Sequence, residues 1–304
     1  CPGQMPAYPG HQEIELALVK LYKTTGRGKY LALAKYFIDM RGRKPVWFDC
    51  ERQSLKDFTG TISDKHYTAD YTYSQAHLPV RMQDTAEGHA VRACYMYAAM
   101  ADIACETNDA ELFGACTKIS EDIINNKLYI TGGIGSAVFS ERFTIKGDLP
   151  NFEAYSETCG SIALVFFAQR MFNMTRDSRY TDVVEKALYN TIYGSVGLDG
   201  KSFYYANPLA EYPAKRNYEF KYQGKKYSCS TRQPWYDTSC CPSNIARLLT
   251  SLGGYIYSVS DEEIYVNLYI ASKIETNIGD VGVMLEQTTS YPNEGNSLFT
   301  VRTS

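Results

Sequence analysis

With 304 residues, 44% of them hydrophobic and 21% charged, the chain is long enough to bury a full-sized core and does not have the composition of a disordered protein. Its formal net charge of −3 provides no broad basic surface for a phosphate backbone, which argues against nucleic acid as a partner. No apolar run is long enough to span a membrane, so the composition indicates a globular protein.

Two helices are predicted within the first 40 residues. Residues 13–22 place Ile14, Leu18 and Leu21 on one helical face, which we expect to point inward. A pair of glycines then interrupts the pattern, and a second helix is predicted over residues 29–40. The segment therefore indicates a helical hairpin.

The same pattern of helix, short loop and helix recurs from residue 88 and again from residue 156. Its repeat of about seventy residues is too irregular for a solenoid of short period and favours helical hairpins arranged around a ring, with functional loops at one end. Nine cysteines are scattered along the chain, so we expect most to be reduced. Cys94, Cys105 and Cys116 fall inside apolar helical patterns and are interpreted as packing residues.

Strand-like sequence is found in two stretches between the predicted helices and again after residue 258. Residues 128–143 are rich in glycine and β-branched side chains, and residues 201–227 are rich in tyrosine, so both have β character. After residue 258 the pattern changes to an alternation of apolar and polar side chains, over 264–270 and again over 281–289. We interpret these last stretches as the opening strands of a β-sandwich.

A candidate metal site comes from four residues in two pairs. Cys240 and Cys241 are adjacent, and adjacent thiols strain badly as a mutual disulfide but can both reach one ion. Glu157 and Cys159 form a second pair, near a predicted helix start where residues two apart can point the same way. Three sulfurs and one carboxylate suit tetrahedral Zn²⁺. The alternatives are that the paired cysteines are small buried apolar residues and that Glu157 is a helix-capping carboxylate.

Five stretches of the chain carry recognisable motifs. They are PGHQEIELALVKLY from Pro9, QAHLPVR from Gln75, GHAVRA from Gly88, YITGGIGSAVFSERFTIKGDLPNFEAYSETC from Tyr129 and SCCPSNIARLLTSLGG from Ser239. Together, and in this order, they strongly resemble the β-L-arabinofuranosidase family of glycoside hydrolases, family 127 and its relatives.

The resemblance implies a mainly α fold, an (α/α)6 barrel followed by the start of a β-sandwich domain. We place the barrel portion at residues 1–258 and the beginning of the sandwich at residues 259–304. It also implies that several barrel helices before this chain, and a section after Ser304, belong to the whole protein. The chain is therefore expected to be an internal fragment.

The resemblance also assigns the chemistry of the cysteines. It places a thiolate nucleophile on Cys240 and a Zn²⁺ ion on Glu157, Cys159, Cys240 and Cys241, with Cys240 as the labile ligand. A free thiol is mostly protonated at neutral pH, whereas coordination by zinc keeps it as a thiolate. A metal-bound cysteine would therefore be ready to attack an anomeric carbon.

Glu141, in the segment FSERF, corresponds to the general acid/base of the family. Its task would be to protonate the leaving oxygen and then to activate water. We expect the pKa of this carboxyl to be raised by apolar surroundings that Phe139 and Phe143 provide. Without the motif, Glu141 beside Arg142 would be interpreted as a surface salt bridge.

The four histidines differ in the strength of their motifs. His11 and His89 follow glycines at predicted helix starts and match substrate-contacting histidines of the family. Neutral imidazoles there can hydrogen-bond sugar hydroxyls. His77 lies in a matched motif but is equally compatible with a structural role, and His66 has no motif and is expected to be exposed.

Tyr205, in FYYANP, resembles a family tyrosine near the nucleophile, with Tyr204 as the alternative if the register slips by one. Either residue is also compatible with a strand position that packs on an apolar face. The chain has 26 tyrosines against two tryptophans, and tyrosine offers a sugar both an apolar ring and a hydroxyl.

The implied function is a zinc-dependent retaining exo-glycosidase that releases terminal β-L-arabinofuranose from plant-type glycans through a cysteine thioglycosyl intermediate. One alternative keeps the mechanism but changes the furanoside, for instance to a branched acidic pectin sugar. Another is a noncatalytic carbohydrate-binding or zinc-stabilised domain. The partner would be an arabinofuranoside or oligosaccharide; a homodimer is one expectation for the assembly, and the sequence does not decide between cytoplasm and periplasm.

Overall fold

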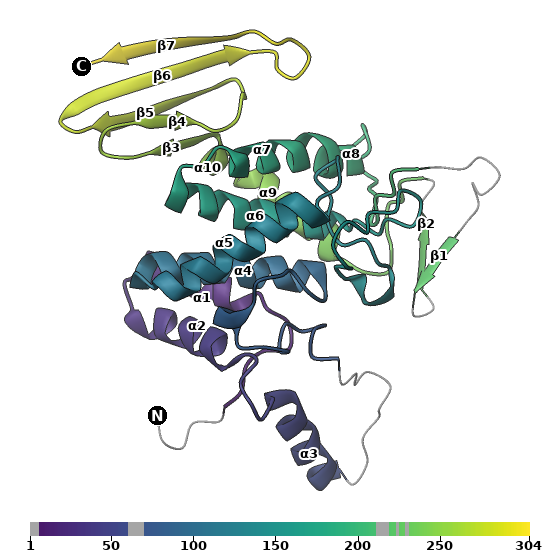
Figure 1. Cartoon of the computed structure of the whole chain (residues 1–304). Helices are drawn as coiled ribbons and strands as arrows, with labels where there is room; N and C mark the ends of the chain where they lie inside the picture. Colours follow the sequence, from purple (N-terminus) through teal and green to yellow (C-terminus); the bar gives the residue numbers. More distant parts are fainter. Residues whose placement is uncertain (1–5, 60–69, 211–218, 223–224, 229–230) are drawn as a thin grey trace.

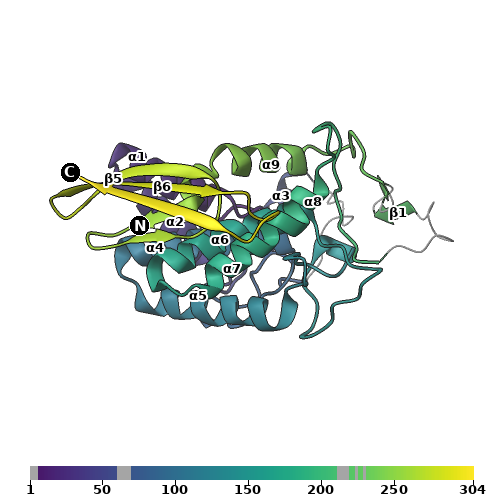
Figure 2. The same cartoon turned by 90° about the horizontal axis from the view of Figure 1, so that it is seen from above.

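The computed structural model describes residues 6–59, 70–210, 219–222, 225–228 and 231–304. A helical body occupies most of the chain, and the strands after residue 256 form a layer at one end of it, next to α7 (Arg179–Lys186) and α10 (Gly253–Ile256) (Figures 1 and 2). The mainly α fold followed by a small sheet region is as the sequence predicts. No helix in this described part is long and apolar enough to cross a membrane.

Helix α1 (Ile14–Thr25) and helix α2 (Gly28–Met40) form the predicted hairpin. Gly26 caps α1 in the left-handed conformation, with φ of 67°, and its N–H donates to the carbonyl of Tyr22. Helix α3 (Trp47–Thr59) follows and projects away from the helical body (Figure 1).

The predicted inward face of α1 is only partly correct. Leu18 is buried as predicted, but Ile14 and Leu21 are 44% and 40% exposed, and Leu16 and Val19 are buried instead. Glu15 is also buried, beside Arg41, the C-cap residue of α2; both side chains are fully enclosed and their charged ends lie 3.8 Å apart. The buried face of α1 therefore includes a charged residue that apolar spacing alone does not assign to it.

Helix α4 (Ala90–Thr107) and helix α6 (Thr158–Thr175) run through the centre of the main core cluster. Both are buried on nearly all sides, which explains why their sequences are apolar all round. Helix α5 (Ala110–Asp122) packs on α4, and helix α7 (Arg179–Lys186) packs on α6. Short helical elements complete the body: Val80–Met82, the π-helices Ile123–Lys127 and Ala187–Ile192, Phe139–Glu141, and α8 (Tyr193–Ser195).

The three cysteines interpreted as packing residues divide into two kinds. Cys94 and Cys116 are fully buried in the core, as predicted. Cys105 is exposed, so its interpretation as a packing residue is wrong. It lies in the last turn of α4, where the helix emerges from the core and its outer side meets solvent.

The β character of the two middle regions is realised only in part. Residues 128–143 form turns, a single short helical turn and isolated bridges such as that between Ala137 and Arg142. The second region contains strand β1 (Glu219–Tyr222), which pairs antiparallel with β2 (Lys225–Ser228). Residues 211–218 and 223–224 of the predicted stretch lie outside the described residues.

Helix α9 (Cys240–Thr250) packs on α6 and leads through α10 (Gly253–Ile256) into the strands. Strands β3 (Tyr257–Val259) and β4 (Ile264–Val266) form one antiparallel pair. Strands β5 (Ser272–Ile278), β6 (Val281–Thr289) and β7 (Ser297–Thr303) form an antiparallel sheet in that order. The second predicted alternating stretch, 281–289, is β6; of the first, only 264–266 is a strand.

Candidate active site

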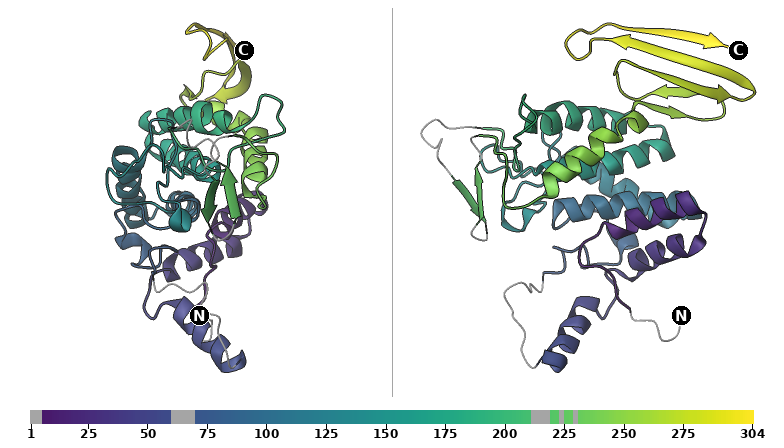
Figure 3. Two further views of the ribbon diagram at one scale, coloured as in Figure 1. Left: turned by 90° about the vertical axis from the view of Figure 1, so that its right-hand side faces the viewer. Right: turned by 180° about the vertical axis from the view of Figure 1, so that it is seen from behind.

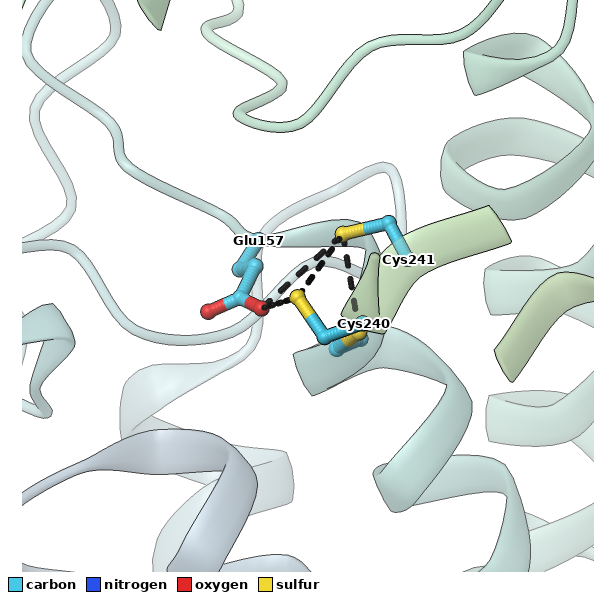
Figure 4. Close-up of side chains that lie close together, drawn as sticks. Glu157, Cys240 and Cys241 are labelled. Carbon is cyan, nitrogen blue, oxygen red and sulfur yellow. Dashed lines mark hydrogen bonds between the residues drawn. The ribbon is translucent and has the colours of Figure 1, made fainter. Parts of the chain in front are cut away.

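The candidate site lies where the starts of two helices meet. Glu157 is the N-cap residue of α6, and Cys240 and Cys241 open α9 (Figure 4). Cys159 lies in the first turn of α6, so the cap position and the first turn let Glu157 and Cys159 project toward the same point, as the sequence predicts. The start of α6 is fixed by the segment that carries Tyr205, whose carbonyl accepts from the N–H of Thr158 at 2.9 Å.

The two pairs form one compact cluster. The ligand-type atoms of Glu157, Cys159, Cys240 and Cys241 all lie within 4.8 Å of one another. The sulfurs of Cys159 and Cys241 are 3.5 Å apart, and those of Cys240 and Cys241 are 3.9 Å apart. Oε1 of Glu157 lies 3.7 Å from the sulfur of Cys240 and 3.9 Å from that of Cys241. One Glu and three Cys therefore form a group that could hold a metal ion.

Burial, hydrogen bonds and neighbouring charge shift the pKa values of three of these groups in different directions. The pKa of Glu157 is raised because the carboxyl is desolvated and lies near Glu141 and Cys240. The pKa of Cys241 is also raised, mainly by burial. The pKa of Cys240 is strongly lowered, because the thiols of Cys159 and Cys241 and then the hydroxyl of Tyr205 hydrogen-bond its thiolate. Of these groups, the thiol of Cys240 is therefore the one whose charged form is favoured.

Glu141 lies beside this cluster with two hydrogen-bonding partners. Nε2 of His89 is 2.7 Å from its Oε2, and the hydroxyl of Tyr155 donates to its Oε1 at 2.9 Å. The expectation of a raised pKa is wrong here: burial alone would raise it, but the hydrogen bond and charge of His89 and the hydrogen bond from Tyr155 outweigh burial and lower it. Phe139, one of the two phenylalanines expected to enclose Glu141, is 67% exposed.

The backbone around Glu141 is held in an unusual conformation. Ser140 and Glu141 both have positive φ, 61° and 52°, which costs energy for residues with a side chain. Arg142 anchors the segment, because its guanidinium donates to Asp70 at 2.6 Å and to the hydroxyl of Thr72 at 2.5 Å. The alternative suggested by the sequence, a surface salt bridge between Glu141 and Arg142, is therefore wrong: Arg142 pairs with Asp70, and Glu141 contacts His89 and Tyr155.

A cavity of about 260 Å³ opens over the cluster. Seven of the eight predicted site residues line it, and they come from six separate parts of the chain: His11, His89, Glu141, Glu157, Cys159, Tyr205 and Cys240. Cys241 is fully buried and is not part of the lining. The hydroxyl of Tyr205 lies 3.3 Å from the sulfur of Cys240.

The remaining sequence candidates lie elsewhere. His77 is half-buried and is not part of this cavity, and Tyr204, the alternative to Tyr205, faces the guanidinium of Arg232 at 4.7 Å instead. His66 lies outside the described residues. His89 is the N-cap residue of α4, which agrees with its predicted place at a helix start.

Six further polar residues at or beside the cavity were not predicted as site residues. Tyr155 holds Glu141, and five others line the cavity: Glu13, Tyr95, Ser243, Asn244 and Arg247. All of them except Tyr95 lie inside the quoted motifs, but nothing in their local sequence indicated a role. Arg247 donates to Glu13, which lies 234 positions away in the chain, so only the fold brings them together.

Comparison with known proteins identifies the family. The sequence profile of the glycoside hydrolase family 127 β-L-arabinofuranosidase catalytic domain matches residues 2–254, and the profile of the family's middle domain matches residues 263–304. The chain belongs to family 127. This agrees with the resemblance that the motifs carry.

Individual family 127 relatives are similar over almost the whole chain. The non-reducing end β-L-arabinofuranosidase of Bifidobacterium longum subsp. longum is 37% identical over 98% of this chain. The crystal structure of a family 127 β-L-arabinofuranosidase from Geobacillus stearothermophilus T6 is 45% identical over 100% of this chain, with a TM-score of 0.90. Another solved family 127 β-arabinofuranosidase is 42% identical over 99% of this chain, with a TM-score of 0.81.

The chain spans less than half of each of these family 127 proteins. It covers 44% of the Bifidobacterium protein, and 46% and 42% of the two solved structures. The similarity to these relatives therefore describes less than half of a whole family 127 protein.

Proposed function

We propose that the full protein is a zinc-dependent retaining exo-glycosidase that releases terminal β-L-arabinofuranose, with Cys240 as nucleophile and Glu141 as general acid/base. The main support for the proposal is that the two adjacent cysteines differ in their exposure to the cavity and in their pKa values. Cys240 lines the cavity and has a lowered pKa, whereas Cys241 is enclosed and has a raised one. A purely structural metal site would not require one of its sulfurs to face a sugar-sized cavity beside a buried glutamate.

The spacing of the four ligand atoms suits zinc. Thiolate and carboxylate atoms bound at 2.0–2.3 Å to a tetrahedral Zn²⁺ ion would stand about 3.6–3.8 Å apart. The measured separations among Glu157, Cys159, Cys240 and Cys241 that are given above run from 3.5 to 3.9 Å. Oε2 of Glu157 is also buried without a hydrogen-bond partner among the described residues, which is costly unless a ligand compensates it. Bound zinc would keep the cysteines deprotonated at neutral pH.

In the first step the thiolate of Cys240 attacks the anomeric carbon and the bond to the leaving oxygen breaks. Glu141 gives its proton to that oxygen, so the leaving group departs as an alcohol. The carboxyl of Glu141 must be protonated at this moment, and a sugar that fills the cavity favours this form because it excludes water from the carboxyl. His89 and Tyr155 hold the two oxygens in place throughout.

In the second step Glu141, now a carboxylate, takes a proton from water. That water attacks the anomeric carbon, the carbon–sulfur bond breaks and the thiolate of Cys240 is restored. The hydroxyl of Tyr205, at 3.3 Å, stabilises this thiolate as a leaving group by donating a hydrogen bond to it. Two displacements at one carbon return the original β configuration.

The shape of the site favours cleavage at the end of a glycan. A cavity of about 260 Å³ is smaller than the pockets that hold drug-sized molecules, and it suits a single sugar ring. His11 and His89 line it and are proposed to hydrogen-bond the sugar hydroxyls. The pKa of His11 is lowered, mainly by desolvation and then by Arg92 and His89, so a neutral imidazole is favoured.

We further propose that the barrel portion ends near residue 258 and that the following strands open a separate domain. The family profiles, which leave residues 255–262 unmatched between them, support this division. The chain also passes there from α10 into strand β3.

The direct test is a substrate screen with the full-length protein and zinc. The panel contains 4-nitrophenyl α- and β-furanosides and pyranosides of L-arabinose together with other pentoses. We expect release of nitrophenol from the β-L-arabinofuranoside at least 100-fold faster than from any pyranoside. Preference for a pyranoside, or no hydrolysis of any furanoside, would refute the proposed activity.

A further inference from the structure

The wall of the cavity carries one guanidinium group. Among the described residues that line it, Arg247 is the only lysine or arginine, whereas Glu13, Glu141 and Glu157 are carboxylic acids. The hydrogen-bond and ion-pair partners of Arg247 therefore affect whether the cavity can accept a negatively charged sugar. A substrate carboxylate would have no other guanidinium or ammonium group to pair with at this wall.

Arg247 is already bound by three partners. Its Nε and Nη2 both donate to Oδ1 of Asn244, at 3.1 and 2.6 Å, and Nη2 also donates to the hydroxyl of Tyr95 at 2.7 Å. Nη1 donates to Oε1 of Glu13 at 2.7 Å. The guanidinium carbon also lies 5.5 Å from the ring centres of Tyr95 and Phe166. Four elements of the fold thus fix the side chain in one position.

Glu13 differs from the other partners because it carries charge and lies at the mouth of the cavity. The side chains of Glu13 and Arg247 are each 41% exposed, whereas Glu157 and Cys159 below them are buried. Glu13 precedes α1 and Arg247 lies in the last turn of α9, two helices on the same face of the body (Figure 3, right). Both residues line the cavity, so a sugar bound in it lies close to this ion pair.

We propose that Glu13 sets the charge selectivity of the site: by pairing with Arg247 it withholds the only guanidinium that the described residues give the cavity wall from a substrate carboxylate, and the site therefore takes neutral sugars. This inference rests on the proposed glycosidase function and narrows its substrate class. It separates two sugars that the sequence left open, a neutral arabinofuranose and a branched acidic furanose.

The arrangement predicts what happens when the charge of Glu13 is removed. Asn244 and Tyr95 still hold Nε and Nη2 of Arg247, so the guanidinium keeps its position while its Nη1 loses its charged partner. A guanidinium held in place without an opposite charge beside it is a good partner for a carboxylate. Repulsion between Glu13 and an incoming anion also disappears.

The test measures binding, so that it does not depend on catalysis. Two non-hydrolysable thioglycosides of β-L-arabinofuranose are used, one with the natural hydroxymethyl group at C4 and one with a carboxylate in its place. Their dissociation constants are measured by calorimetry with full-length wild type, Glu13→Gln, the double variant Glu13→Gln/Arg247→Gln, and Glu111→Gln. Glu111 is an exposed acid in the first turn of α5, so its variant controls for the same change in net charge.

We expect the wild type to bind the neutral ligand at least about tenfold more tightly than the carboxylate. Glu13→Gln should shift the ratio toward the carboxylate by about tenfold or more, the double variant should abolish this gain, and Glu111→Gln should leave the wild-type ratio unchanged. An unchanged ratio in Glu13→Gln would overturn the inference. If that variant does not fold, a wild type that binds the carboxylate as tightly as the neutral ligand would overturn it as well.

Binding and hydrolysis test the inference about Glu13 and the proposed reaction separately. If the wild type shows the predicted charge selectivity in binding but hydrolyses no furanoside, the proposed activity fails and the selectivity stands. If it hydrolyses the neutral furanoside and the ratio does not respond to Glu13, only the inference about Glu13 fails.

Discussion

At the scale of single residues, Glu141 has to be protonated in one step of the proposed reaction and charged in the other. His89 and Tyr155 favour its charged form, yet the first step needs the acid. An arrangement of this kind suits the second step, in which the group acts as a base. The first step then depends on the bound sugar to displace water and favour the proton.

This assignment makes the effect of Glu141→Gln depend on the leaving group. A nitrophenolate leaves without a proton, whereas an alkoxide does not, so the variant should lose about 100-fold more kcat/KM on methyl β-L-arabinofuranoside than on the nitrophenyl glycoside. Steady-state kinetics of the full-length protein on both substrates give the comparison. Equal losses on the two substrates would indicate that Glu141 only binds or supports the sugar.

At the scale of secondary-structure elements, the cluster joins the starts of α6 and α9. Glu157 and Cys159 belong to one helix start and Cys240 and Cys241 to the other, so an ion bound among them would cross-link two segments more than 80 positions apart in the chain. Metal binding and stability are then coupled.

We therefore expect about one equivalent of zinc in the protein purified without added metal, and Cys159→Ser should lose most of it. The same variant should melt at a lower temperature, because a cross-link of the native state is lost. Elemental analysis and thermal unfolding measure the two effects. Cys105→Ser is the matched control, since Cys105 is exposed and lies outside the cluster; zinc retained in full by Cys159→Ser would contradict the ligand assignment.

Sequence patterns predicted correctly those elements that depend on residues close together in the chain. The alternation over residues 281–289 is strand β6, and the pairing of Glu157 with Cys159 at a helix start follows from helix geometry. The inward face of α1 was predicted only in part, because it includes Glu15, which is buried beside Arg41 in a distant segment of the chain. Residues 128–143 have strand-like composition but form turns and bridges around Glu141.

The contacts that complete the site are long-range for the same reason. Tyr155 contacts Glu141 across 14 positions, and Asn244 reaches Tyr95 across 149. Apolar periodicity carries no information about such pairs. The catalytic and metal candidates could be named beforehand only because motifs marked them, and the residues that hold or flank them became visible only in the fold.

At the scale of the whole molecule, the helical body brings distant segments to one cavity. His11 comes from the first residues, His89 from the start of α4, and Cys240 from the start of α9. The chain spans 44% of its Bifidobacterium relative, so each functional test above uses the full-length protein. The central claim, however, concerns a single atom inside this chain, the sulfur of Cys240.

The most direct measurement is covalent labelling of that atom. The full-length protein is treated with a cyclophellitol-type epoxide that mimics β-L-arabinofuranose, and the modified residue is located by peptide mass spectrometry. The account predicts one label per chain, on Cys240, with Cys241 unmodified because it is buried outside the cavity lining. A label on Glu141 or Glu157 with Cys240 untouched would contradict the cysteine mechanism.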